Sequence, residues 1–98
     1  MSQDFRVEFT ARSREDVQAA RHWLTQPGSG RRSHRRYLAL LHALSDLGGS
    51  PHRWPASDHV GFRKRSIEGY LVIYSIDAGR RTITVRRIFG PGQETSTL

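Results

Sequence analysis

The chain opens with alternating apolar and polar residues. In "DFRVEF", residues 4–9, Phe5, Val7 and Phe9 fall on one side of an extended backbone and charged residues fall on the other. A period of two is typical of a strand with one buried face. The pattern therefore predicts a strand over residues 4–9.

The next segment has helical spacing. Ser13 and Asp16 form an S-x-x-D helix-start signal, which places acidic residues near the positive end of the helix dipole. One apolar stripe follows, formed by Val17, Ala20 and Leu24. The breaker "QPGSG" ends it, so the pattern predicts a helix over about 14–25.

A second helix is predicted over about 31–47. Apolar residues recur there at spacings of three and four, at Tyr37, Leu40, Leu41, Leu44 and Leu47, before "GGSP" stops the pattern. The connection between the two helices is about five residues long, so we expect them to form an antiparallel hairpin. Residues 48–58 lack periodicity and predict a loop.

Three strands are predicted in the second half of the chain, over 60–67, 70–76 and 82–89. The segment 70–76 is apolar on both faces and is expected in the centre of the sheet. The predicted fold class is α+β with the order βααβββ, in which a helical hairpin packs on one face of a small, mainly antiparallel sheet. We expect a single domain over 1–98, with 89–98 as a flexible tail.

Composition points to an anionic partner. The net charge is +7, the chain has no cysteine, and arginine supplies all cations except Lys64. Guanidinium groups bind phosphate or carboxylate in bidentate fashion, which favours nucleic acid or an acidic protein surface. A genome rich in G and C is an alternative cause of the Arg/Lys ratio, although it does not explain the net charge.

Other classes of function find no support in the sequence. The start of the chain lacks the apolar run of a signal peptide and no segment approaches a membrane span, so we expect a cytoplasmic protein. The histidines show no metal-ligand spacing, and no glycine-rich loop suits a nucleotide. We expect no metal and no cofactor.

The strand arginines are the candidate binding residues. Strand alternation places Arg63 and Arg65 on one face of 60–67, opposite Lys64, and places Arg86 and Arg87 on opposite faces of 82–89. We expect cations of neighbouring strands to form one patch on the open sheet face. The alternative is a solvated face whose arginines pair with acids or water. The predicted partner-binding residues are Arg63, Lys64, Arg65, Arg86, Arg87 and Phe89.

Two further features bear on binding. Trp23 and Trp54 are expected as core and loop anchors, with base stacking as the alternative role. The run "RRSHRR" over 31–36 is expected to form the solvated first turns of the second helix, where its charges oppose the helix dipole. This unfavourable arrangement suggests an anionic partner nearby.

The segments "FRKRSIEGYLVIYSI" and "TITVRRIFGPGQ" resemble the carboxy-terminal half of the RelE/ParE superfamily of bacterial type II toxins. A basic strand, a Gly-Tyr-led apolar strand and a final arginine-bearing strand recur there in this order. The resemblance extends over the opening strand and the helical hairpin. It implies the same βααβββ layout that the periodicity predicts.

Within that superfamily, RelE-like members cleave messenger RNA on the ribosome, with an arginine after the Gly-Tyr pair and often a tyrosine or histidine beyond the last strand. Here Leu71 follows Gly69 and Tyr70, and neither Tyr nor His follows Tyr74. Arginines alone stabilise charge and are poor proton-transfer groups. The resemblance therefore implies the ParE-like branch, a non-enzymatic inhibitor of DNA gyrase associated with plasmid stabilisation.

The resemblance also implies a cognate antitoxin, with an acidic segment that folds on binding. Three alternatives stay open. One is a RelE-like ribosome-dependent mRNA endoribonuclease that uses redeployed basic residues. Another is a nucleic-acid-binding module in which "RRSHRRY" opens a recognition helix. The third is a decayed toxin.

Overall fold

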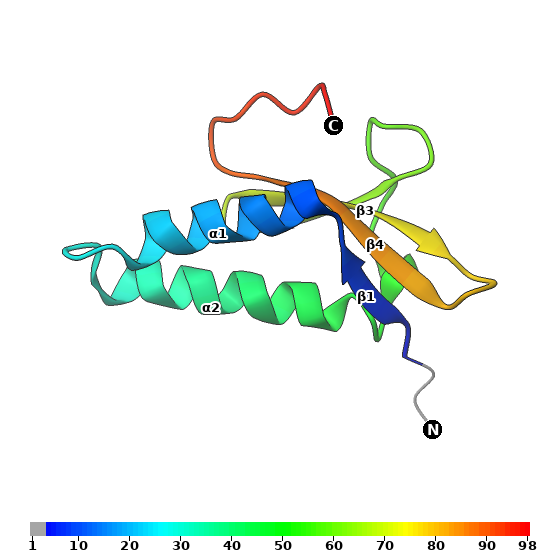
Figure 1. Cartoon of the computed structure of the whole chain (residues 1–98), viewed down its shortest axis with the longest axis horizontal. Coiled ribbons are helices and arrows are strands. Elements are labelled where there is room, and N and C mark those ends of the chain that lie inside the picture. The colour runs from blue at the N-terminus through cyan, green and yellow to red at the C-terminus, as the bar shows by residue number, and fades with distance from the viewer. Residues whose placement is uncertain (1–3) are drawn as a thin grey trace.

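The computed structural model describes residues 4–98 and places two helices against one face of a four-stranded sheet (Figure 1). The elements are β1 (Arg6–Phe9), α1 (Ala11–Thr25), α2 (Gly30–Asp46), the short 3-10 helix η1 (Pro51–Arg53), β2 (Arg63–Ile67), β3 (Tyr70–Asp77) and β4 (Thr82–Phe89). This order confirms the predicted βααβββ fold. No helix within residues 4–98 is both long and apolar enough to cross a membrane.

The sheet has the strand order β1-β4-β3-β2, with β1 parallel to β4 and the other neighbours antiparallel. The helical hairpin carries the chain away from β1, and the β2-β3-β4 meander brings β4 back beside it. β3 lies between two strands, as its apolar composition predicts, while β1 and β2 form the edges.

The core lies between the helical hairpin and the sheet. The helices contribute Ala20, Leu24, Leu40, Leu44 and Leu47, and the sheet contributes Tyr70, Val72, Tyr74, Ile83, Val85 and Ile88. On β3 the core residues alternate, as expected for a strand with one face toward the helices. Burial of these apolar surfaces supplies the main force that holds the two layers together.

Helix α1 begins three residues before its predicted start. The N-cap is Thr10, whose Oγ1 accepts a hydrogen bond of 3.0 Å from the Ser13 amide. Ser13 lies inside the first turn and donates its hydroxyl hydrogen to the Thr10 carbonyl. The interpretation of Ser13 and Asp16 as the start signal is therefore wrong, because Thr10 already satisfies the helix amide.

Strand β2 begins at Arg63 and not at residue 60. The preceding residues form a turn in which the Phe62 amide donates to the His59 carbonyl at 3.0 Å and Gly61 has a φ of +87°. Val60 is 98% exposed at this turn. An extended strand cannot include Gly61 in this left-handed conformation, so the predicted strand loses its first three residues.

The sheet face opposite the helices is partly covered. Ile73 and Phe89 point away from the core cluster, yet they are 1% and 2% exposed. The residues after β4 turn back toward the loop that precedes β2 (Figure 1), where the His59 ring forms a hydrogen bond of 2.8 Å with the Thr95 carbonyl. This face is therefore less open than the sequence predicts.

Candidate target-binding surface

The two arginines of β2 lie on the sheet face that the helices cover. Arg63 is paired with Tyr74 and Arg65 with Val72, and both partners belong to the core cluster. Arg63 Nη1 donates to the Trp54 carbonyl at 2.6 Å and to the His52 carbonyl at 3.3 Å. The predicted alternation is confirmed, but the expected placement of these two arginines on the open face is wrong.

Arg65 connects β2 to the end of α2. Its Nη1 donates to the Ala43 carbonyl at 3.0 Å, and its guanidinium lies 4.2 Å from the centre of the Trp54 ring. Ala43 is among the last four residues of α2, whose carbonyls have no partner within the helix. Arg65 therefore caps α2 and fixes the loop that contains Trp54. The expectation of Trp54 as a loop anchor is confirmed.

Lys64 lies on the opposite face of β2, paired with Ile73. It lines a small hollow under the chain terminus together with Ser57, Asp58, His59, Leu71, Ile73 and Thr95. Lys64 is half-buried there and is separated from Arg63 and Arg65 by the thickness of the sheet. The three consecutive cations therefore do not form one patch.

A β-bulge in β4 changes the faces of its last residues. Tyr74 pairs with Val85, whereas the preceding Ile73 pairs with Arg87, so Arg86 has no partner on β3. Ile88 consequently joins the core cluster on the same face as Val85. Strict alternation over 82–89 would place Ile88 and Val85 on opposite faces, but the unpaired residue shifts the alternation by one.

Arg87 is buried against α1. Its Nε lies 2.9 Å from Asp16 Oδ2, and the same oxygen accepts a 2.8 Å hydrogen bond from the Ile88 amide. Arg87 and Asp16 are 8% and 7% exposed. The Arg87 guanidinium also lies 4.4 Å from the centre of the Phe89 ring. Arg87 and Phe89 therefore stabilise the junction of α1 with β4.

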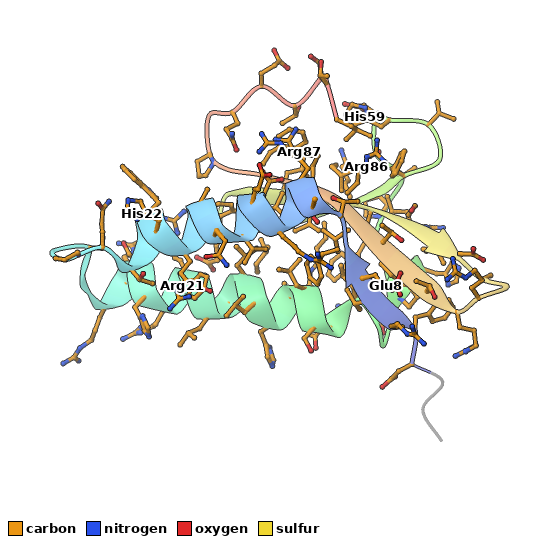
Figure 2. All side chains as sticks on the ribbon, viewed as in Figure 1. Glu8, Arg21, His22, His59, Arg86 and Arg87 are labelled. Atoms are coloured by element: carbon orange, nitrogen blue, oxygen red, sulfur yellow. The ribbon has the colours of Figure 1, made fainter. Side chains whose placement is uncertain are left out.

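Arg86 differs from the other strand arginines because its side chain is exposed at the bulge (Figure 2). The backbone there is fixed by Thr10, whose hydroxyl donates to the Arg86 carbonyl at 3.1 Å. Within residues 4–98 the Arg86 guanidinium has no ion-pair or hydrogen-bond partner. Of the six predicted binding residues, Arg86 is thus the cation that a partner reaches directly.

Two buried tyrosines have altered acidity. Burial raises the pKa of Tyr74 above its ordinary value of 10.0, although Arg63 and Arg65 oppose this rise, and the Tyr74 hydroxyl donates to the Pro51 carbonyl at 2.7 Å. Burial likewise raises the pKa of Tyr70, against the charge of Arg36. Both hydroxyls therefore stay protonated at neutral pH, which makes them poor general bases.

Sequence reasoning missed two surface grooves. One, of about 470 Å³, runs between α1 and the segment after β4, and Trp23 lies at its edge with 64% of its surface exposed. The expectation of Trp23 as a core anchor is therefore wrong. The other, of about 230 Å³, is lined mainly by apolar side chains of β1 and both helices: Val7, Phe9, Val17, Leu41, Leu44 and Ser45. Leu41 belongs to the apolar stripe of α2, and this stripe was the feature of the sequence that could have indicated the groove.

Solved toxin structures share this fold. A chain from the chromosomal ParDE system of P. aeruginosa superposes with a TM-score of 0.72 at 15% identity, covering 92% of this chain and 99% of its own length. A chain from the RelBE2 toxin-antitoxin complex of Mycobacterium tuberculosis gives a TM-score of 0.66 at 22% identity, with 92% and 94% covered. A chain from the E. coli RelBE toxin-antitoxin complex gives a TM-score of 0.64 at 15% identity, covering 92% of this chain and 99% of its own length.

No curated protein matches the sequence directly. A family model does match, over residues 7–93, and it is described as the ParE toxin of the type II toxin-antitoxin system parDE. The matched range includes every helix and nearly every strand residue from β1 to β4. The chain therefore belongs to the ParE toxin family of type II toxin-antitoxin systems.

Proposed function

We propose that this protein is a toxin that stops growth by binding DNA gyrase, without cleaving RNA itself. The observation that carries the proposal is the ParE family match over residues 7–93. The roles of the strand arginines are compatible with it, because Arg63, Arg65 and Arg87 hold parts of the fold together. An inhibitor that acts by binding needs complementary surface and no proton-transfer apparatus.

The chemistry of RNA cleavage supports binding over catalysis. A ribonuclease must deprotonate the 2′-hydroxyl and protonate the leaving oxygen, in addition to stabilising the phosphate charge. Leu71 occupies the position after Tyr70. Tyr70 and Tyr74 are buried residues of the core cluster whose hydroxyls stay protonated. Arg86 supplies charge stabilisation alone.

We further propose that a cognate antitoxin neutralises the toxin. The apolar groove beside β1 offers a site for an antitoxin segment, since Val7, Val17 and Leu41 leave apolar surface at the edge of the sheet. β1 is an edge strand, so its outer backbone groups are available to an added strand. The solved ParDE and RelBE structures come from toxin-antitoxin systems, which supports a partner of this kind.

Expression in a bacterial host tests the proposed mode of action. We expect growth arrest with chromosomal double-strand breaks, because a gyrase trapped with cleaved DNA leaves broken chromosomes, while messenger RNA stays full length. Arg86→Ala is the informative variant, with the surface change Arg80→Ala in the β3–β4 turn as its matched control. Early fragmentation of messenger RNA at ribosome-bound sites, with intact chromosomes, would contradict the proposal and favour the RelE-like alternative.

A further inference from the structure

The helical hairpin carries an unbalanced positive charge. All nine acidic residues of the chain lie outside residues 17–45, whereas five arginines lie within that range, at positions 21, 31, 32, 35 and 36. The range covers the second half of α1, the turn and nearly all of α2. The excess charge of the protein is therefore concentrated on one structural unit.

Four of these arginines are exposed: Arg21, Arg31, Arg32 and Arg35. We call them the hairpin arginines. None of the four has an ion-pair partner within residues 4–98. Arg36 differs, because its Nη2 donates to the Glu68 carbonyl at 2.8 Å and its Nε lies 4.0 Å from the Glu68 carboxylate. Glu68 also lines a surface hollow with Arg32 and Arg35, but among the described arginines it is within ion-pair distance of Arg36 alone.

Some cations outside residues 17–45 have acidic neighbours. Arg6 lies 3.4 Å from Glu8, and Arg12 lies 3.3 Å from Glu15. The hairpin arginines lack such pairs within residues 4–98. Arg31 and Arg32 also lie in the first turn of α2, where the helix dipole adds further positive potential. The hairpin turn and the β3–β4 turn lie at opposite ends of the molecule, whose longest dimension is 45 Å (Figure 1). The molecule is consequently polarised along this axis.

We propose that the hairpin arginines bind the phosphate backbone of duplex DNA without sequence preference. Guanidinium groups bind phosphate oxygens strongly, and phosphate contacts position a protein without reading bases. Single-stranded nucleic acid is the poorer fit, because proteins that bind it stack successive bases on several aromatic rings. Trp23 is the one strongly exposed aromatic residue among residues 4–98. This inference rests on the proposed function and adds to it a role for the hairpin, which holds the toxin on the DNA that gyrase has engaged.

Salt dependence of binding is the direct test. Fluorescence anisotropy would follow the purified full-length chain on a labelled 20-base-pair duplex of arbitrary sequence, over a series of salt concentrations. Four phosphate contacts give a slope of log K against log salt of about −3.6. The double variant Arg31→Gln/Arg35→Gln removes two contacts, so its slope should be shallower by about 2.

The matched control is Arg6→Gln/Arg80→Gln, which removes the same charge from the opposite end of the molecule. It should leave the slope within about 0.5 of the wild type if the contacts are confined to the hairpin. Equal changes in both double variants would overturn the proposal, because they would indicate diffuse charge attraction. Tighter binding to single-stranded DNA or RNA of the same length, or absence of duplex binding at low salt, would overturn it as well.

Gyrase is absent from this assay, so its outcome is distinguishable from that of the proposed function. A chain that binds duplex DNA through the hairpin but does not inhibit gyrase would preserve this inference as a binding property and refute the choice of target. Circular dichroism of each variant verifies the fold, which the exposed positions of all four substitutions leave intact.

Discussion

Asp16 and Arg87, 71 residues apart in the sequence, form a buried ion pair with 2.9 Å between Oδ2 and Nε. The Asp16 carboxylate also accepts a hydrogen bond from the Ile88 amide. Ile88 lies beyond the part of β4 that pairs with β1. One carboxylate from α1 thus satisfies a strand amide that has no β1 partner. This contact fixes α1 against the sheet at the β4 bulge.

Asp16→Ala should reduce the free energy of unfolding by about 3–5 kcal/mol, because it leaves the Arg87 charge buried without a partner. Urea denaturation gives this value. Glu15→Ala is the control, since Glu15 pairs with Arg12 on the surface with 70% of its side chain exposed and should cost no more than about 1 kcal/mol. Equal losses in the two variants would show that the buried pair has no special importance.

Arg65→Ala should reduce the free energy of unfolding by about 1–2 kcal/mol. The change removes the hydrogen bond to the Ala43 carbonyl and the contact with the Trp54 ring. The loss of stability is moderate because Arg65 Nε is buried without a hydrogen-bond partner among residues 4–98. Removing this group also removes the desolvation penalty of an unsatisfied buried donor. Ser66→Ala, at an exposed position of the same strand, should change stability by less than about 0.5 kcal/mol in the same urea experiment.

Stability should fall at high pH, in part because of Tyr74. Burial raises the pKa of Tyr74 in the folded protein above 10.0, so its hydroxyl ionises first in the unfolded chain. The contribution of Tyr74 to the free energy of unfolding is therefore complete below about pH 10. It is lost as the pH rises from about 10 through the higher pKa of the folded protein. Tyr74→Phe should cost about 1 kcal/mol at pH 7 through the lost bond to Pro51, yet decline less steeply above pH 10. Parallel curves for the two proteins would refute this assignment.

Arg86→Ala should weaken gyrase inhibition about tenfold, which corresponds to about 1.4 kcal/mol of binding free energy. Its exposed side chain makes no contact that holds the fold, so the free energy of unfolding should change by less than about 0.5 kcal/mol. Inhibition is measured as the toxin concentration that halves supercoiling. Full potency in this variant would remove Arg86 from the target-binding surface.

Much of the fold is predictable from local patterns. The spacing of Leu40, Leu44 and Leu47 predicts α2 to within one residue at each end, and the apolar run 70–76 predicts the interior position of β3. Each such pattern repeats over many residues, so a single irregularity does not obscure it. The Thr10 cap was also present in the sequence, but Ser13 offered a competing signal three residues later.

The candidate site was less predictable because it depends on contacts distant in sequence. Alternation shows that Arg63 and Arg65 share a face, but the identity of the covered face depends on how the hairpin packs. The bulge at Arg86 depends on the β3–β4 register and has no local signal. The absence of acids over 17–45 was legible in the sequence and would have indicated the basic hairpin directly.

A gyrase assay with purified toxin decides whether gyrase is the target. Full-length toxin is added to gyrase and relaxed plasmid, and both supercoiling and enzyme-linked cleaved DNA are measured. We expect loss of supercoiling together with accumulation of linear plasmid covalently bound to gyrase. Unchanged supercoiling at excess folded toxin, combined with cleavage of messenger RNA on purified ribosomes, would contradict it.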